Sequence, residues 1–315
     1  MHSAQFQLHA DIEQRHWWFV GRRRIMQRIV AEVLPPSRDA TILDIGCGTG
    51  ANLAALADRY TCVGIDTSPE AIALARQRFP NVCFLVGNAP DDVPELISQA
   101  RLLLLMDVLE HVGDDFAALS RLLAAAPPGC LCLLTVPADE SLWSEHDESF
   151  GHFRRYDRGR FARLWAGLPV TPLMVSYFNS RLLPVIRLFR AWSRRRGKAA
   201  GEAGTDFWMP MRPLNALLQA ALAGEAGRLV SVLRRRRGAG YKAGASLMAL
   251  LRCNEGPIAV RARPTDLAPD HQPEKVQGSR SKVQDAKPVV PCTLNLEPCT
   301  LNLVPSPIRR ALKPL

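Results

Sequence analysis

The chain has 315 residues, of which 47% are hydrophobic, a composition typical of a globular protein with a sizeable core. No short apolar core follows a basic start at the N-terminus, and charged residues or prolines interrupt the longest apolar runs. We therefore expect neither a secretion signal nor a membrane span. The eight cysteines lack metal-ligand spacing. They predict reduced thiols in a cytoplasmic protein that is not secreted and binds no metal.

The net charge of +10 is concentrated in one part of the chain. Residues 161–260 contain 16 Lys and Arg but only 4 Asp and Glu, so the remainder is close to neutral. A basic region joined to a neutral one predicts an anionic partner. Charge alone leaves open whether this partner is a nucleic acid, a lipid surface or a substrate.

Strand and helix patterns alternate over residues 41–136. Continuous apolar runs predict strands at 41–46, 62–66, 82–87, 101–107 and 129–137. Amphipathic patterns predict helices at 51–60, 68–79 and 114–126, with Ser68 as the N-cap of the second. Such a series is typical of a mostly parallel sheet covered by helices on both faces. We expect a doubly wound, Rossmann-like α/β domain over residues 39–178, preceded by a helical lid over residues 1–38.

The pattern changes after Pro137. The polar and aromatic segment 138–160 is too long for a simple connection, and long loops in compact domains are usually functional. Beyond it the patterns predict a helix at 159–167, a strand at 171–178, an amphipathic helix at 180–196, one or two basic helices within 213–237 and a last strand at 244–253. We therefore expect a basic helical insertion and a last strand over residues 179–254.

One face of the predicted helix 180–196 is apolar and the other is basic. The apolar face has Leu182, Val185, Ile186, Phe189 and Trp192, and Arg187, Arg190 and Arg194 lie away from it. The tail, residues 255–315, contains PCTLNLE followed directly by PCTLNLV. A repeat this short fits no solenoid unit and predicts a disordered, low-complexity tail, with a short binding motif used twice as the alternative.

A glycine-rich turn, LDIGCGTG (43–50), follows the first predicted strand. Gly46, Gly48 and Gly50 occupy every second position, unlike the G-x-G-x-x-G of pyrophosphate sites, and no Lys-Ser or Lys-Thr follows as in triphosphate loops. Asp44 would repel a phosphate but can hold an ammonium group. Asp66, at the end of the second strand, can accept both hydroxyls of a ribose. The pattern predicts an adenosine that carries an amine and no phosphate, which describes S-adenosylmethionine.

Four segments in order resemble class I S-adenosylmethionine-dependent methyltransferases of the broad type 11 kind. These are LDIGCGTG, GIDTSPEAIALAR, LLLMDVLEHV and PPGCLCLLTVP. HWWFVGRR (16–23) and HDESFGHFRRY (146–156) are similar to segments of a bacterial subgroup, and this resemblance extends to about residue 253. It implies the class I methyltransferase fold and a methyltransferase that uses S-adenosylmethionine.

The resemblance also implies which residues bind the cofactor. The glycines let the backbone approach the methionine part, Asp44 holds the ammonium and Asp66 the ribose. Asn88 stands at the adenine edge, where many relatives have an aspartate. The implied set is Asp44, Gly46, Cys47, Gly48, Gly50, Asp66, Thr67, Asn88, Ala89, Asp107, Val108 and Leu109. In the alternative interpretation, the two acids only cap helices and the glycines only form a turn.

Methyl transfer from a sulfonium requires alignment, exclusion of water and removal of a proton where the acceptor carries one. His152 is the preferred base, ahead of His146. His111, after the fourth strand, either acts as a base or supports the cofactor pocket.

Paired arginines can clamp a carboxylate or phosphate, so Arg154 and Arg155 are candidate substrate residues, together with Tyr156 and Trp18. Alternatively, Asp147 or Glu148 pairs with these arginines inside the loop, and Trp17 and Trp18 only cover the core. We interpret Arg22, Arg23 and Arg24 as solvated.

The acceptor is expected to be a small molecule or a lipid-linked glycan, because basic amphipathic helices favour peripheral contact with an anionic membrane. A helical cap over the sheet is the alternative role for these helices. Two other functions stay open, an RNA methyltransferase and a non-catalytic S-adenosylmethionine-binding protein. Nucleic acid is disfavoured because DVLEHV (107–112) lacks the Asn/Asp-Pro-Pro-aromatic motif and no RNA-binding module is recognisable.

Overall fold

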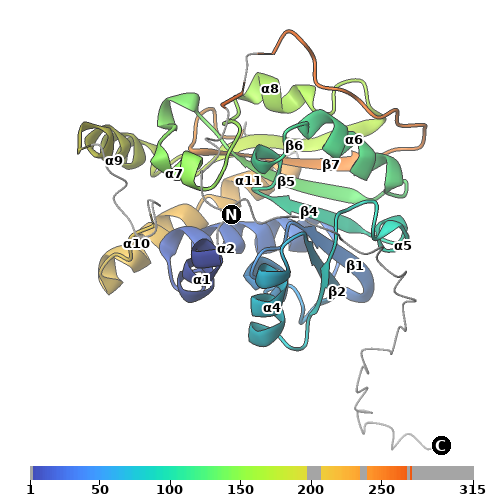
Figure 1. Ribbon diagram of the computed structural model, residues 1–315, viewed down its shortest axis with the longest axis horizontal. Coiled ribbons are helices and arrows are strands. Elements are labelled where there is room, and N and C mark those ends of the chain that lie inside the picture. Colours follow the sequence, from blue (N-terminus) through green and yellow to red (C-terminus); the bar gives the residue numbers. More distant parts are fainter. Residues whose placement is uncertain (1–2, 197–206, 235–239, 268–269, 272–315) are drawn as a thin grey trace, which may run out of the picture. The chain divides into compact units, whose positions relative to one another are not determined.

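The computed structural model describes residues 3–196, 207–234, 240–267 and 270–271, without the side chains of residues 3–5 and 192–196. Within this part, a seven-stranded sheet has the order β3-β2-β1-β4-β5-β7-β6 (Figure 1). The strands are β1 (Ser37–Ile45), β2 (Tyr60–Asp66), β3 (Cys83–Val86), β4 (Leu102–Met106), β5 (Leu131–Pro137), β6 (Val170–Phe178) and β7 (Ser246–Cys253). The first five strands pair in parallel, whereas β7 is antiparallel to both β5 and β6. This arrangement confirms the predicted Rossmann-like fold of class I methyltransferases.

Helices cover both faces of the sheet (Figure 1). They are α1 (Ser3–Ile12), α2 (Trp17–Val33), α3 (Ala51–Ala54), α4 (Pro69–Arg78), α5 (Pro94–Ser98), α6 (Asp115–Ala125), α7 (Glu145–Ser149), α8 (Arg158–Arg163), α9 (Leu183–Arg196), α10 (Arg212–Ala223) and α11 (Ala226–Leu233). Two 3-10 helices are η1 (Leu109–His111) and η2 (Glu140–Leu142).

Each face of the sheet has its own hydrophobic core. Successive side chains of a strand point to opposite faces, so Leu104 packs with Ile25 of α2, while Leu103 packs with Phe116 of α6. All four of these side chains are fully buried. Because each face of the sheet packs into its own core, the central strands are apolar at every position and do not alternate between apolar and polar residues. Among the described residues, the six cysteines are free thiols.

Several element ends differ from the sequence prediction. Ser68 caps α4 as predicted, with its Oγ accepting from the amide of Ala71 at 3.2 Å. The predicted helix 51–60 shortens to α3, because the amides of Leu56 and Arg59 bond three residues back and form tight turns before β2. The short α5 is not predicted from the sequence.

The segment after β7 contacts the domain over part of the predicted disordered tail. Within residues 255–267, the amide of Arg261 donates to Ser120 Oγ at 2.9 Å, and its guanidinium donates to the carbonyl of Ala166 at 2.6 Å. The boundary at residue 255 is therefore too early. The repeat at 291–304 lies outside the described residues.

The basic insertion forms α9, α10 and α11, of which α10 and α11 pack against α2. Residues Arg212–Leu233 are long and apolar enough to cross a membrane. Helices in a protein core often have the same length and composition, so these two properties do not identify a membrane span. In the structure this stretch is two helices that meet at Gly224 and Glu225. The Oε1 of Glu225 accepts from the amides of Ser180 and Arg181, both at 2.8 Å, so the stretch is tied to the segment before α9.

Candidate active site

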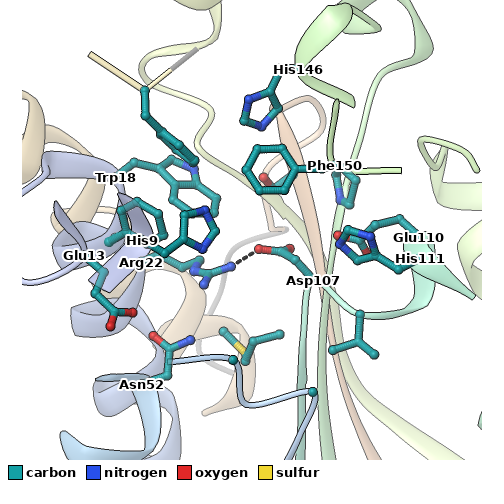
Figure 2. A pocket seen from close by; sticks show the side chains of 18 of the residues that line it. His9, Glu13, Trp18, Arg22, Asn52, Asp107, Glu110, His111, His146 and Phe150 are labelled. Carbon is teal, nitrogen blue, oxygen red and sulfur yellow. Dashed lines mark ion pairs between the residues drawn. The ribbon is translucent and has the colours of Figure 1, made fainter. Parts of the chain in front are cut away.

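A cavity of about 920 Å³ opens where β1, β2 and β4 end at their carboxyl edge. Open α/β sheets bind ligands at this edge. Figure 2 shows His9, Trp18 and Arg22 of the N-terminal helices on one wall, with His146, Phe150 and His111 opposite them. The N-terminal segment thus forms part of the cavity, together with the loop after β5 and the helical insertion.

The amides of the glycine turn already have acceptors within the protein. Those of Gly46 and Cys47 donate to the carbonyl of Ile65 at 2.8 and 3.1 Å. The amide of Gly48 donates to Asp66 Oδ2 at 2.8 Å, and that of Gly50 to the carbonyl of Cys47 at 3.1 Å. A phosphate-binding turn needs free amides that converge on the anion. The turn is therefore unsuited to a phosphate, as its spacing predicts.

Two of the three glycines of the turn have no room for a side chain. Gly46 has φ +71°, and a Cβ there would lie 2.7 Å from Cγ2 of Val108. Gly50 has φ +86°, and a Cβ there would lie 2.6 Å from the ring of Phe84. Both positions therefore require glycine. Gly46 lines the cavity, whereas Gly50 does not and serves the packing behind the turn.

The two acids predicted to bind the cofactor differ in their environment. Asp66 lines the cavity, and its Oδ1 accepts from the amide of Ser68 at 2.9 Å, which fixes the carboxylate while leaving lone pairs for hydroxyl groups. Asp44 lies beneath the turn and does not line the cavity, and neither of its oxygens has a hydrogen-bond partner among the described residues. Burial raises the pKa of Asp44 to about 7, against the influence of Arg22. An unpartnered buried carboxylate is costly, so this position fits a cationic group.

Arg22 contradicts the prediction that it is solvated, because it is buried and lines the cavity. Its guanidinium forms an ion pair with Asp107 (Figure 2), and its Cζ lies 4.3 Å from the centre of the Trp18 ring. Asp107 Oδ1 also accepts from the hydroxyl of Thr135 at 3.0 Å. The methionine part of the cofactor is zwitterionic, and Arg22 can hold its carboxylate. Arg22 belongs to the segment HWWFVGRR, which is the sequence signal for its place in the site.

Most of the remaining predicted cofactor residues line the cavity. They are Cys47, Gly48, Thr67, Asn88, Ala89 and Val108. Leu109 is an exception, since its side chain is buried in the core that includes Leu105 and Phe116. The backbone turns at Asp107, which has φ +62°, and this turn directs the next residues of η1 toward the cavity.

The three candidate bases all line the cavity. The rings of His111 and His152 have centroids 4.6 Å apart, and those of His146 and His152 are 6.4 Å apart. Burial lowers the pKa of His111 to about 3 and also lowers the pKa of His146 and His152. These imidazoles are therefore neutral at physiological pH. The sequence reasoning missed Glu110, which lines the same wall and whose pKa burial raises to about 8.

The loop 146–156 holds itself together by internal ion pairs. Arg155 donates from Nε to Asp147 Oδ1 at 3.0 Å and from Nη2 to Asp147 Oδ2 at 3.1 Å. Asp147 also contacts His152 Nδ1 at 2.9 Å. Arg155 lines the cavity, but its charge is already balanced. This corresponds to the alternative in which Asp147 pairs with an arginine of the loop.

Arg154 and Tyr156 do not line the cavity, in contrast to their predicted role in substrate binding. The guanidinium of Arg154 donates to the carbonyls of Leu109, Val112 and Gly113 at 3.1, 2.6 and 2.8 Å, so it positions η1. The hydroxyl of Tyr156 donates to Asp115 at 2.8 Å in the core. Both side chains support the wall of the cavity from behind.

An apolar wall completes the site on the side of the insertion. Its members are Phe6, Trp17, Trp18, Phe150, Leu182, Val185, Ile186, Phe189, Phe207, Trp208, Leu214 and Leu218. The predicted faces of α9 are partly wrong: Val185 is 59% exposed, whereas Arg190 is buried and lines the cavity. The prediction that Trp192 lies on the apolar face and Arg194 away from it concerns side chains outside the described part of the structure.

Comparison with known proteins places this site in a family. A model described as a methyltransferase domain matches residues 18–193. The chain is 25% identical over 197 residues to trans-aconitate 2-methyltransferase of Azoarcus sp. strain BH72, covering 61% of this chain and 75% of that one. It is 33% identical over 125 residues to the same enzyme of Deinococcus radiodurans, covering 38% of this chain and 47% of that one, so it spans about half of this relative.

Among solved structures, a TehB-like S-adenosylmethionine-dependent methyltransferase from Corynebacterium glutamicum matches with a TM-score of 0.42 and 15% identity, covering 75% of this chain and 88% of that one. The cofactor is S-adenosylmethionine, as the turn and its acids predict. Since the family model covers more than half of the sequence, the chain belongs to the family of proteins with this methyltransferase domain.

Proposed function

We propose that the protein methylates a small amphiphilic acceptor, such as a lipid-linked glycan, at an anionic membrane surface. The observation that supports this is the continuity between the cavity wall and exposed apolar side chains. Val185, Trp208 and Leu214 line the cavity and are also 59%, 53% and 37% exposed. An acceptor with an apolar part can therefore enter the cavity along a surface that suits it.

The exposed apolar surface extends beyond the cavity mouth. Leu188 of α9 is 74% exposed, and Met211 and Leu217, at the start and within α10, are 74% and 66% exposed. Both helices lie on the same side of the view as α1 (Figure 1). Large apolar side chains left exposed on two helices favour an interaction surface there. We call the six residues Val185, Leu188, Trp208, Met211, Leu214 and Leu217 the apolar mouth.

Positive charge accompanies the apolar mouth. Residues 161–260 have 16 Lys and Arg against 4 Asp and Glu. Arg181, Arg187 and Arg212 are exposed on or next to α9 and α10. Basic and apolar side chains on one surface favour an anionic bilayer, to which each basic residue near the surface contributes about 1 kcal/mol.

The cavity is less suited to a tricarboxylate, although eight relatives are named for trans-aconitate. Three arginines line it, and each faces a carboxylate of the protein. Arg22 pairs with Asp107 and Arg155 pairs with Asp147. Arg190 Nη1 lies 3.9 Å from Asp147 Oδ2. A highly charged acceptor would have to displace these pairs, whereas an apolar one would not.

The bound cofactor supplies a methyl group on a sulfonium, which needs little covalent help. The side chains of this chain would exclude water, align the acceptor and receive its proton. Trp18, Phe150 and Phe189 form aromatic surfaces around the cavity. The cavity wall offers neutral imidazoles, and one of them can accept a hydrogen bond from an acceptor hydroxyl.

Two measurements test this function. Calorimetry with S-adenosylhomocysteine should show binding of one equivalent, and its absence would contradict the methyltransferase. Transfer of a labelled methyl group should occur to a lipid extract rather than to aconitate. Label in aconitate or in RNA, with none in lipid, would refute the proposed acceptor class.

Flotation with vesicles tests the membrane surface. We expect binding to vesicles of phosphatidylglycerol and not to those of phosphatidylcholine. The substitutions Leu188→Glu and Leu217→Glu, which lie outside the cavity lining, should reduce this binding, whereas Val260→Glu is the matched control at another exposed apolar residue, 58% exposed. If both variants float like the wild type, the apolar mouth is not a membrane contact.

A further inference from the structure

We propose that Glu110, His111 and His152 form a binding site for one divalent transition-metal ion on the acceptor side of the cavity. One ligand atom from each side chain can be chosen so that all three lie within 4.8 Å of one another. Ligand atoms around one tetrahedral ion at about 2.0–2.2 Å lie about 3.3–3.6 Å apart, so side-chain rotations that bring the three atoms about 1 Å closer close the cluster around it.

Glu110 is the strongest indication of a missing cation. Its side chain is fully buried, and neither carboxylate oxygen has a hydrogen-bond partner among the described residues. The nearby guanidiniums form their ion pairs with other carboxylates, Arg22 with Asp107 and Arg155 with Asp147. A buried carboxylate that is neither paired nor hydrogen-bonded is costly, and a bound metal ion removes that cost.

His152 is oriented as metal-bound histidines are. Its Nδ1 lies 2.9 Å from Asp147 Oδ1, which leaves Nε2 to face the cluster. Asp147 is itself fixed by Arg155 and by the amide of Ser144, which donates to its Oδ2 at 3.0 Å. A carboxylate on the far nitrogen sets the tautomer and raises the basicity of the ligand, the usual support for a metal-bound imidazole.

The other two ligands are held by the backbone of η1. The amide of Phe153 donates to the carbonyl of Glu110 at 2.8 Å, and Arg154 binds the carbonyls on either side of this residue pair. Glu110 and His111 therefore keep their place relative to His152. A site built on fixed backbone loses little entropy when the ion binds.

The ligand set indicates the class of ion. Two neutral imidazoles and one carboxylate suit Zn²⁺, Fe²⁺ or Co²⁺, rather than Mg²⁺ or Ca²⁺, which prefer oxygen ligands. Three protein ligands leave a coordination position open, and all three residues line the cavity, so a ligand in the cavity could occupy that position. The ion would bind an oxygen of the acceptor there; this role rests on the proposed function, whereas the metal site itself does not. The absence of Cys-type spacing in the sequence had predicted no metal.

Metal titration of the tag-free, full-length protein after removal of chelator tests the site. We expect one equivalent of Co²⁺, seen in the visible spectrum, and one of Zn²⁺, seen by calorimetry. The substitutions Glu110→Gln and His111→Gln should each weaken binding by at least about 100-fold, since the loss of a supporting residue alone costs about 10–100-fold. His271→Asn is the control, because His271 and Glu140 form a second His–Glu pair at 2.6 Å on the surface.

A second measurement needs no variant. Imidazole nitrogen NMR of the wild type should show two of the seven histidines shifting on addition of Zn²⁺. The proposal is overturned if neither ion binds saturably at micromolar concentration, if the two cavity variants bind as the wild type does, or if His271→Asn abolishes binding. If the protein binds the metal but transfers no methyl group, the metal site stands and the proposed function is contradicted. Calorimetry with S-adenosylhomocysteine tests binding of the cofactor independently of the metal.

Discussion

Replacing Asp44 by asparagine should make the protein more stable while weakening its hold on the cofactor. Burial raises the pKa of Asp44 to about 7 from an ordinary value of 3.8. The folded protein therefore keeps a proton that the unfolded chain has already lost, and stability falls as pH rises through this interval. At about 1.36 kcal/mol for each pH unit, the full cost is about 4 kcal/mol above the folded pKa.

Asparagine has the same shape and does not ionise in this range. Its amide leaves polar atoms unsatisfied in the same buried position, which costs about 1–3 kcal/mol. The net gain for Asp44→Asn is thus about 1–3 kcal/mol at about pH 8. At about pH 5 most of the gain disappears, because the wild-type carboxyl is still largely protonated in the folded state.

Urea denaturation of both proteins without cofactor, at about pH 5 and about pH 8, measures this difference. The difference in free energy of unfolding, variant minus wild type, should be about 2–3 kcal/mol larger at about pH 8 than at about pH 5. Asp58→Asn, at an exposed acid, is the control and should show no such change. A variant that is less stable at both pH values, with no widening gap, would refute the reasoning about buried charge.

The same variant should bind S-adenosylhomocysteine more weakly. A hydrogen bond to a charged group contributes about 1.5–3 kcal/mol, which corresponds to about 10–150-fold in Kd. Calorimetry at about pH 8 compares the two proteins. Unchanged affinity would show that Asp44 does not serve the ammonium of the cofactor.

Three further substitutions test other parts of the site. Arg22→Met should weaken binding of S-adenosylhomocysteine by at least about tenfold, because a charged partner of the methionine carboxylate is lost; calorimetry that gives an unchanged Kd would contradict this. Tyr156→Phe should lower the free energy of unfolding by about 1–3 kcal/mol, since Asp115 loses one of its donors, yet leave the KM for the cofactor unchanged because the side chain lies outside the cavity. Gly50→Ala should lower the melting temperature, because its φ of +86° and the contact with Phe84 leave no room for a methyl group; a melting temperature equal to that of wild type would refute the steric argument.

The core of the fold is readable from the sequence because its strands are buried on both faces. Leu102–Met106 are all buried, and a continuous apolar run of this length is typical of a strand in a parallel sheet that is covered on both faces. Helix ends were harder to predict. The residues after Ala54 have helical propensity, but their amides bond to carbonyls three residues back and form tight turns instead. Tyr60 then begins β2, and its hydroxyl donates to the carbonyl of Leu34 at 2.7 Å.

The cofactor half of the site is also encoded locally. Asp44, the glycine turn and Asp66 lie within one strand–turn–strand segment, so their types and spacing predict the ligand without knowledge of the tertiary structure. Arg22 could not be placed in this way. Arg22 is the first of three consecutive arginines. The packing of α2 against the sheet buries Arg22 and leaves Arg24 exposed.

The acceptor half differs because no single segment forms it. The ring of His9 in α1 lies 5.3 Å from that of Phe150 and 5.5 Å from that of Phe207, residues about 140 and 200 positions away in the sequence. Changes in any of these segments can reshape the acceptor wall while the glycine turn, held by its own amide hydrogen bonds, keeps its geometry. The chain thus separates the donor site, which its motifs predict, from the acceptor site, whose chemistry follows only from the side chains that the fold brings together.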